Sequence, residues 1–419
     1  MTQTRGGLRP SRIAAPLGNL NMENIRKNFL AALALPLAAF AQEAVKPEAP
    51  ADAAPGCNKP AVATECLEPA QPVEAVDAEV VFVLDTTGSM SGLIEGAKQK
   101  IWSIAGGIIQ RTGGEVRIGL VPYRDRGDAY VTRLFPLTNN LDQVYADLQG
   151  FHAAGGGDLP ESVNQALNEA VTKIQWSDTN SVMRTIFLVG DCPPHMDYQD
   201  DVKYPESCAL AASRNIVINT VQCGGEPATQ PIWREIARLT NGGYSQIGQS
   251  GNMRIVTTPY DVEIQRINIE ISKTVLPYGT AAAQSSFYGL LKSNVSAPAP
   301  VAASRNAVKA KRMEAYAELD APIMGQDLTA EPDKLKSIAE GDLPEELKGL
   351  SPEARQAKLD EVVAKRRELN AQLVELNRKR EEFLREEATR APAEAGASFD
   401  SEVLKSIDGQ LLRLRSTKE

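Results

Sequence analysis

The sequence predicts an α/β fold, with a doubly wound, mostly parallel sheet followed by a C-terminal α-helical extension. The first observation is that the apolar runs, such as EVVFVLD at 79–85, are continuous, as in strands buried on both faces of a sheet. The second is that these runs alternate with segments whose apolar residues recur every three or four positions, which is typical of amphipathic helices. After about residue 276 only helical patterns continue.

The predicted elements alternate regularly along this part of the chain. The expected strands cover residues 79–85, 116–123, 130–137, 184–191, 216–223 and 244–247. The expected helices cover residues 91–108, 142–149, 163–174, 208–212, 233–239 and 260–275. We therefore expect one domain over 77–276. Ligands of such sheets bind beyond the carboxyl ends of the strands.

The N-terminal region carries the pattern of a targeting signal. Arg26 and Lys27 precede an apolar run at 29–40, and Ala39-Phe40-Ala41 matches a cleavage site. We expect residues 1–41 to be upstream residues and a signal peptide, with translation starting at Met22. A Pro/Ala-rich linker over 42–76 follows. The apolar run is shorter than the ~20 residues that span a bilayer. These features predict an exported protein, periplasmic or secreted, with no stable membrane span.

The C-terminal region divides into three parts. Residues 277–350 mix linker-like composition with short helical signals, and 389–419 form a tail with a short helix at 401–415. Between them, Ser351 and Pro352 open a long amphipathic helix over 351–388.

The apolar stripe of this long helix centres on Leu369, Leu373 and Leu376. Arg366 and Arg380 occupy two positions of the stripe, where a strict coiled coil does not usually place arginine. Two interpretations stay open: a coiled coil used for self-association or partner binding, and a helix packed on its own neighbours.

The sharpest motif is DTTGSMS at 85–91, at the end of the first predicted strand. Its spacing places the Asp85 carboxylate and the hydroxyls of Thr87 and Ser89 in one loop. Hard oxygen ligands of this kind suit Mg²⁺. The simpler alternative is that these residues only start the following helix.

This loop resembles the metal-ion-dependent adhesion site of the von Willebrand factor A family, which reads D-x-S-x-S, with Thr87 in the place of the first serine. The resemblance covers about half the chain and implies two further ligands, Asp158 and Asp191. It also implies one bound Mg²⁺ or Mn²⁺, whose coordination is completed by an acidic residue of a protein ligand. With YRD at 123–125, GGGD at 155–158 and GDCPPH at 190–195, the set looks like a bacterial exported type.

Asp158 has a second interpretation. The pentapeptide GDLPE occurs at 157–161 and again at 341–345. In both copies the aspartate could cap a helix, with the glutamate reaching back from three residues later. Capping and metal ligation can coexist at a helix N-terminus.

Other polar residues near this edge carry weaker predictions. We interpret His195 as a loop residue shaped by two prolines, and Asp197, Asp200 and Asp201 as a solvated loop. Two histidines and no CxxC motif argue against a zinc site. In an exported protein, candidate disulfides are Cys57 with Cys66 and Cys208 with Cys223.

The net charge of −9 disfavours nucleic acid as a partner. The sequence predicts a non-enzymatic module that binds a partner protein through the metal, with the C-terminal helices used for association. One alternative is an assembly or scaffold protein that acts mainly through those helices. A metal-dependent hydrolase is the weaker alternative, because position 87 is Thr where a phosphatase needs a second Asp, and no Ser-His-Asp set is visible.

Overall fold

The computed structural model describes residues 75–315, 326–390 and 397–416. The predicted signal peptide, the linker, and Cys57 and Cys66 lie outside these residues. Within the described ranges, none of the helices combines the length and the apolar character needed to cross a membrane.

Six strands form one sheet in the order β3-β2-β1-β4-β5-β6. The strands are β1 (Val76–Asp85), β2 (Gly113–Tyr123), β3 (Phe135–Thr138), β4 (Met183–Gly190), β5 (Ile216–Cys223) and β6 (Tyr244–Ile247). All neighbouring pairs are parallel except β2 with β3, which is antiparallel. The predicted α/β fold class is confirmed.

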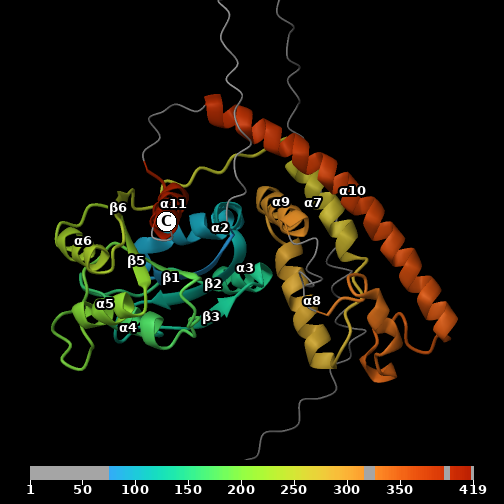
Figure 1. Ribbon diagram of the computed structural model, residues 1–419, viewed down its shortest axis with the longest axis horizontal. Helices are drawn as coiled ribbons and strands as arrows, with labels where there is room; N and C mark the ends of the chain where they lie inside the picture. The colour runs from blue at the N-terminus through green and yellow to red at the C-terminus, as the bar shows by residue number, and fades with distance from the viewer. Residues whose placement is uncertain (1–74, 316–325, 391–396, 417–419) are drawn as a thin grey trace, which may run out of the picture.

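Helices cover both faces of the sheet (Figure 1). On one face lie α2 (Ser91–Thr112) and α3 (Leu141–Gln149), and on the other lie α4 (Val163–Thr172), α5 (Tyr204–Ser213) and α6 (Thr229–Leu239). The side chains of β1 alternate between the two cores: Val80 and Phe82 face the first, and Val81 and Val83 face the second. This alternation explains why the strand is apolar throughout.

The predicted strand at 130–137 is shorter in the structure. Only β3 is regular, and Thr132 forms an isolated bridge with Tyr123. Residues 131–133 still pair with the end of β2, since the Arg124 N–H donates to Val131 and the Arg133 N–H donates to Pro122. The Tyr130 hydroxyl lies 2.7 Å from Thr86 Oγ1, at the end of β1.

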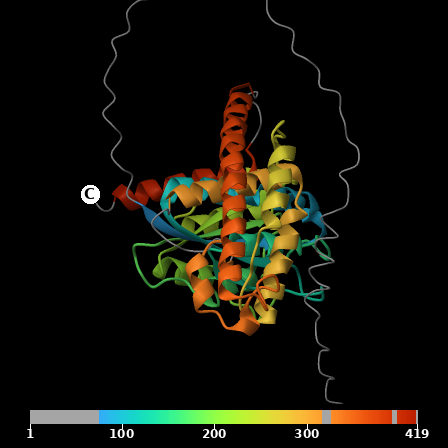
Figure 2. The ribbon, with the colours of Figure 1, turned by 90° about the vertical axis from the view of Figure 1, so that its right-hand side faces the viewer.

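A layer of further helices packs beside the α/β part (Figures 1 and 2). It consists of α7 (Asp261–Ser272), α8 (Ala281–Val295), α9 (Ala299–Ala315) and α10 (Pro352–Arg390), with short 3-10 turns at Pro332–Lys336 and Glu340–Asp342. The region at 277–350 is thus more regular than its composition predicted, and SAPAPVAAS includes the start of α9. Moreover, α7 packs on α9 and α10 and does not cover the sheet, although the sequence analysis placed it within the 77–276 domain.

The long helix α10 packs on its own neighbours. Leu369 and Leu373 are buried with Ile264 and Ile267 of α7. The two arginines of the stripe are paired inside the chain: Arg380 bonds Asp261 at 2.8 Å and Arg366 bonds Asp327 at 2.7 Å. Of the two interpretations left open, the structure has the intramolecular one, because Leu369 and Leu373 are buried within the chain and Leu376 is partly buried beside them.

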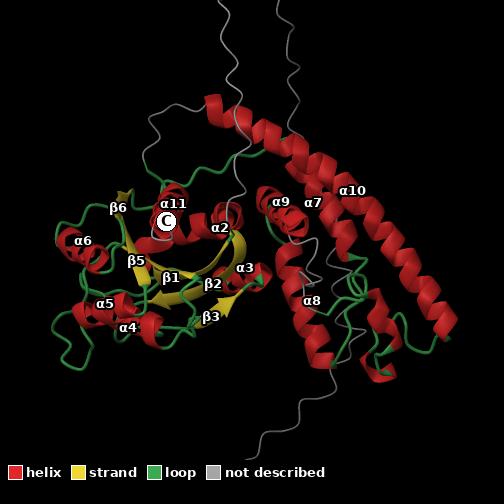
Figure 3. Ribbon diagram, viewed as in Figure 1, coloured by secondary structure: helices red, strands yellow, loops and turns green. Residues whose placement is uncertain are grey.

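The last helix, α11 (Phe399–Ser416), lies over the sheet beside α2 (Figure 3). Its buried apolar residues belong to the same core as α2 and β1, and they are Phe399, Val403, Ile407 and Leu411. Two adjacent glycines of α2 allow this close packing, because a Cβ at Gly106 would meet Val308 of α9 at 2.6 Å, and one at Gly107 would meet Leu404 of α11 at 2.7 Å. The first face of the sheet is thus completed by residues far beyond 276.

Candidate metal centre

Asp85 ends the central strand at the point where the strand order reverses. It pairs with Tyr123 at the end of β2, and Gly190 at the end of β4 lies against its other side. A side chain at Gly190 would collide with the Tyr123 hydroxyl and press on the Asp85 carboxylate. Glycine is therefore required here for the three strand ends to close around one small space. In open α/β sheets, this switch point is where ligands bind.

The loop after β1 holds its oxygen atoms close together. The backbone N–H and the hydroxyl of Thr87 donate to Asp85 Oδ1 at 2.8 and 2.7 Å, and Thr87 Oγ1 lies 3.3 Å from Ser89 Oγ. Asp85 and Thr87 are buried, while Ser89 is exposed. The Gly88 N–H donates to the carbonyl of Gly155, which ties this loop to the glycine-rich loop. The motif thus presents one buried carboxylate and two hydroxyls toward the molecular surface.

Asp191 follows β4 and faces the same space. Its Oδ2 accepts a hydrogen bond from Gln249 Nε2 at 2.7 Å, and its backbone carbonyl accepts one from Thr229 Oγ1 at 2.8 Å. Burial raises the pKa of Asp85 to about 7, and repulsion by Asp191 adds to this, although the hydrogen bonds from Thr87 oppose it. Two carboxylates therefore lie beside one buried space, where their negative charges repel each other.

Four buried oxygen atoms around this space make no hydrogen bond within the described residues. They are Asp85 Oδ2, Asp191 Oδ1, Glu161 Oε2 and the Tyr123 hydroxyl. An unsatisfied buried polar group costs about 1–3 kcal/mol, and more when it is charged. A bound divalent cation satisfies several such oxygens at once, and an all-oxygen donor set is the one that Mg²⁺ and Mn²⁺ accept. The residues present therefore fit a divalent cation.

Glu161, which the sequence analysis considered only as a helix-capping residue, belongs to this group. A Cβ at Gly156 would touch both Glu161 Oε1 and Thr87 Cβ, at 3.2 and 3.3 Å, which places the two side chains side by side. Burial raises the pKa of Glu161 to about 9, and the charges that add to this effect are all acidic, Asp85 and Asp191 among them. Sequence reasoning missed this residue because its position depends on how the glycine-rich loop folds.

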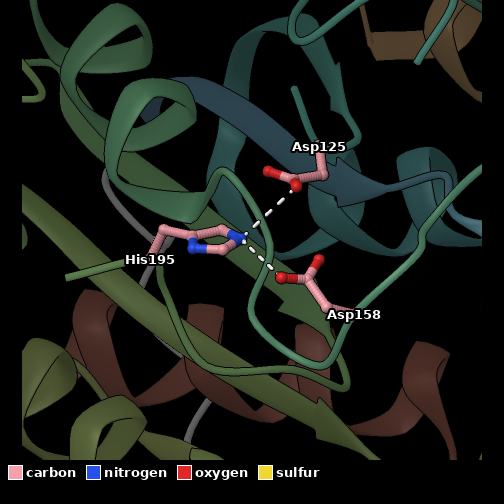
Figure 4. A group of neighbouring side chains, drawn as sticks. All are labelled: Asp125, Asp158 and His195. Carbon is pink, nitrogen blue, oxygen red and sulfur yellow. Dashed lines mark ion pairs between the residues drawn. The ribbon is translucent and has the colours of Figure 1, made fainter. Parts of the chain in front are cut away.

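Asp158 lies elsewhere. Its side chain is 62% exposed, and its nearest ionic neighbour is His195, at 3.8 Å from Oδ2 to Nε2 (Figure 4). Nor does it cap a helix, since α4 begins at Val163 with Ser162 at the N-cap position. In the second GDLPE copy, Asp342 ends a 3-10 turn and caps no α-helix. The structure thus brings together Asp85, Thr87, Ser89 and Asp191, and places Asp158 in a neighbouring cluster with Asp125 and His195.

The predicted pairing of Cys208 with Cys223 is wrong. Both thiols are free, as is that of Cys192. Cys208 on α5 is buried in the core on one face of the sheet, and Cys223 at the end of β5 is buried in the core on the other. The sheet itself separates them, and burial raises the pKa of both thiols.

The match to a family model agrees with this architecture. Residues 79–257 match the family model described as von Willebrand factor A domain. The chain is 24% identical over 195 residues to an ariadne-like RING finger protein, R811, of Acanthamoeba polyphaga mimivirus, which covers 43% of this chain and 19% of that protein. The chain thus spans about a fifth of the length of this relative.

Among solved structures, the chain is similar to proximal thread matrix protein 1 from the mussel byssus. The identity is 14% and the TM-score 0.32, over 42% of each chain. The central parallel sheet, the D-x-T-x-S loop at its carboxyl edge and the match to the family model together support a von Willebrand factor A domain over residues 79–257.

Proposed function

We propose that this domain binds one Mg²⁺ or Mn²⁺ ion and, through it, a partner protein that supplies an acidic side chain. The observation that carries the proposal is the pair of buried carboxylate oxygens, Asp85 Oδ2 and Asp191 Oδ1, that face one space without a hydrogen-bond partner. Thr87 and Ser89 supply hydroxyl ligands beside them, and Glu161 adds a further carboxylate.

The proposal includes a division of roles among these residues. Asp85 and Asp191 hold the ion at the sheet edge, while exposed Ser89 stands on the open side, where the partner's carboxylate approaches. Since Mg²⁺ retains water when few carboxylates bind it, a carboxylate from the partner can replace one of those waters. We further propose that the protein is exported and acts by binding and not as an enzyme. The scaffold function is the alternative, in which partner capture does not depend on metal.

Calorimetric titration of the full-length chain with Mg²⁺ tests the metal site. We expect binding of one ion, lost in Asp85→Asn and retained in Asp360→Asn, which changes an exposed aspartate on α10. Equal Mg²⁺ binding by Asp85→Asn and the wild-type chain would overturn the assignment.

The partner is tested by affinity capture with the same three proteins, in Mg²⁺ and again with EDTA. Capture that requires Mg²⁺ and Asp85 supports the proposal. Capture that persists in EDTA instead favours the scaffold function of the C-terminal helices.

A further inference from the structure

Beside the site at Asp85, three side chains from different loops converge on a second point. Asp125 follows β2, Asp158 lies in the glycine-rich loop, and His195 follows β4 (Figure 4). One ligand atom from each lies within 4.8 Å of the others. We propose that these three residues form a second cation site, suited to a first-row transition metal such as Zn²⁺ that accepts an imidazole nitrogen. The site is separate from the one on which the proposed function depends.

The state of the His195 ring is the observation that points to a ligand. The side chain is 5% exposed, and its Nε2 atom is buried without a hydrogen-bond partner while it faces the two carboxylates. A buried nitrogen with no hydrogen bond is costly unless something else satisfies it.

The remainder of the ring is held in place from several sides. Nδ1 lies 2.8 Å from Asp197 Oδ1, and the ring stacks on Tyr198 with centroids 4.0 Å apart and an interplanar angle of 11°. The backbone N–H of His195 donates to the backbone carbonyl of Glu161 at 3.1 Å. The backbone carbonyl of His195 accepts a hydrogen bond from the Asn164 side chain at 2.6 Å. A carboxylate on one ring nitrogen is the usual support of a metal-bound histidine, because it fixes the tautomer that presents the other nitrogen.

The shorter of the two distances from Nε2 to a carboxylate matches the spacing of ligands around one ion. Nε2 lies 3.3 Å from Asp125 Oδ2 and 3.8 Å from Asp158 Oδ2. A charge-assisted N–H···O bond would bring the atoms to about 2.7–2.9 Å. By contrast, ligands placed tetrahedrally at ~2.0–2.2 Å from one ion lie about 3.3–3.6 Å apart.

The two carboxylates of the cluster differ in their exposure to solvent. Asp125 is buried and oriented by the Ser162 hydroxyl at 2.9 Å and by the Tyr198 hydroxyl at 3.1 Å. Asp158 is largely exposed, so the side of the site that it forms opens to solvent. In this arrangement, Asp125 and His195 would hold the ion from the buried side. A coordination position on the exposed side, next to Asp158, would remain for water or a partner group.

The neighbouring arginines bond other groups and do not neutralise the carboxylates of the cluster. Arg124 donates to the backbone carbonyls of Thr86 and His152, and Arg126 pairs with Asp200 and Asp201. Although two histidines argue against a zinc site, one histidine with two carboxylates is also a donor set that a transition metal accepts.

The test is calorimetric titration of Zn²⁺ into the full-length chain, with Mg²⁺ saturating. We expect one Zn²⁺ per chain, lost in His195→Gln and weakened at least about tenfold in Asp197→Asn, which removes the support of the ring. His152→Gln is the matched control, because it changes the chain's other histidine, which is exposed. Cys192→Ser must also bind Zn²⁺ as the wild type does.

Asp158→Asn distinguishes the loss of a ligand from misfolding. Because this side chain is exposed, its replacement should leave the circular dichroism spectrum unchanged while Zn²⁺ binding weakens. Retention of Zn²⁺ binding in Asp85→Asn, which removes the Mg²⁺ site, separates the two sites. Unchanged Zn²⁺ affinity in both His195→Gln and Asp158→Asn would overturn the proposal, as would loss of Zn²⁺ in Cys192→Ser or Asp85→Asn alone.

Discussion

The ring of Phe399, at the start of the last helix, meets the ring of Phe82 on the first strand edge-on, with centroids 6.1 Å apart and an interplanar angle of 61°. Phe82 in turn stacks on Phe187 of β4 at 5.4 Å. The two ends of the described chain therefore meet in the centre of one core. This contact bears on how much of the chain the von Willebrand factor A domain needs in order to fold.

The first prediction concerns α11. Ile407→Ala should lower the free energy of unfolding by about 2–5 kcal/mol, because it opens a cavity in the sheet core. Leu412→Ala on the same helix should cost little, since Leu412 is 65% exposed. Urea unfolding of both variants measures the difference. Similar small effects in the two variants would mean that α11 is only loosely attached.

The same packing changes the expectation for truncation. A domain that ends at residue 276, as expected from the sequence, would predict that a chain ending near residue 280 stays folded and binds metal, because the α/β part has its own strands and helices. The core contributions of Phe399, Val403 and Ile407 now predict that such a chain exposes apolar surface and loses stability. Circular dichroism and light scattering on the truncated chain decide between the two expectations.

The second prediction concerns the buried ion pair between α10 and α7. Arg380 and Asp261 are 7% and 3% exposed in their side chains. Arg380→Ala should cost about 3–5 kcal/mol of stability, because it leaves the Asp261 charge buried without its partner. Arg378→Ala is the control, since Arg378 is exposed and its ion pairs on the surface of α10 are screened by solvent and contribute little to stability. Equal urea midpoints for the two variants would contradict this assignment.

The third prediction concerns acid stability and Asp142 on α3. Burial alone would raise the pKa of this carboxyl, but Arg305 and Lys309 of α9 outweigh burial and lower it to about 2. A pKa below the unfolded value means that the pair stabilises the fold fully above about pH 4, and that this stabilisation is lost as the pH falls toward 2. Its size is about 2 kcal/mol.

The comparison that isolates this effect is Asp142→Asn against the wild type. The difference in unfolding free energy between them should be largest at neutral pH and should shrink between about pH 4 and pH 2. Asp360→Asn should show no such pH-dependent difference, because that side chain is exposed. A constant difference across this range would mean that Asp142 is not held ionised by the α9 cations.

The parts that the sequence predicted well are those set by local patterns. The loop from Asp85 to Ser89 directly follows the apolar run that becomes β1, and Asp191 follows a second strand of the same kind. Because the two strands are parallel, Asp191 and the loop meet at one edge of the sheet. Glu161 was missed because neighbouring strand ends and the path of the glycine-rich loop decide its place.

The helices were predicted less well for a different reason. An apolar stripe shows that a helix is covered, but not by what. For this reason the helix that becomes α7 was expected within the 77–276 domain, although it packs on α9 and α10, while α11 covers the sheet. Similarly, SAPAPVAAS within 277–350 indicated a linker, although it includes the start of the regular helix α9, and packing against α7 and α2 accompanies this helix in the structure.

The late position of α11 in the chain has a consequence for the order of folding. Domains generally fold in the direction of synthesis, N-terminal parts first. Here the sheet can pair early, but the face that α2 and α3 cover in part is not fully covered until residue 411 has been made, and contacts of such long sequence separation form slowly. The last helix therefore sets the time at which the native core can close, and it delays that event until nearly all of the described chain is present.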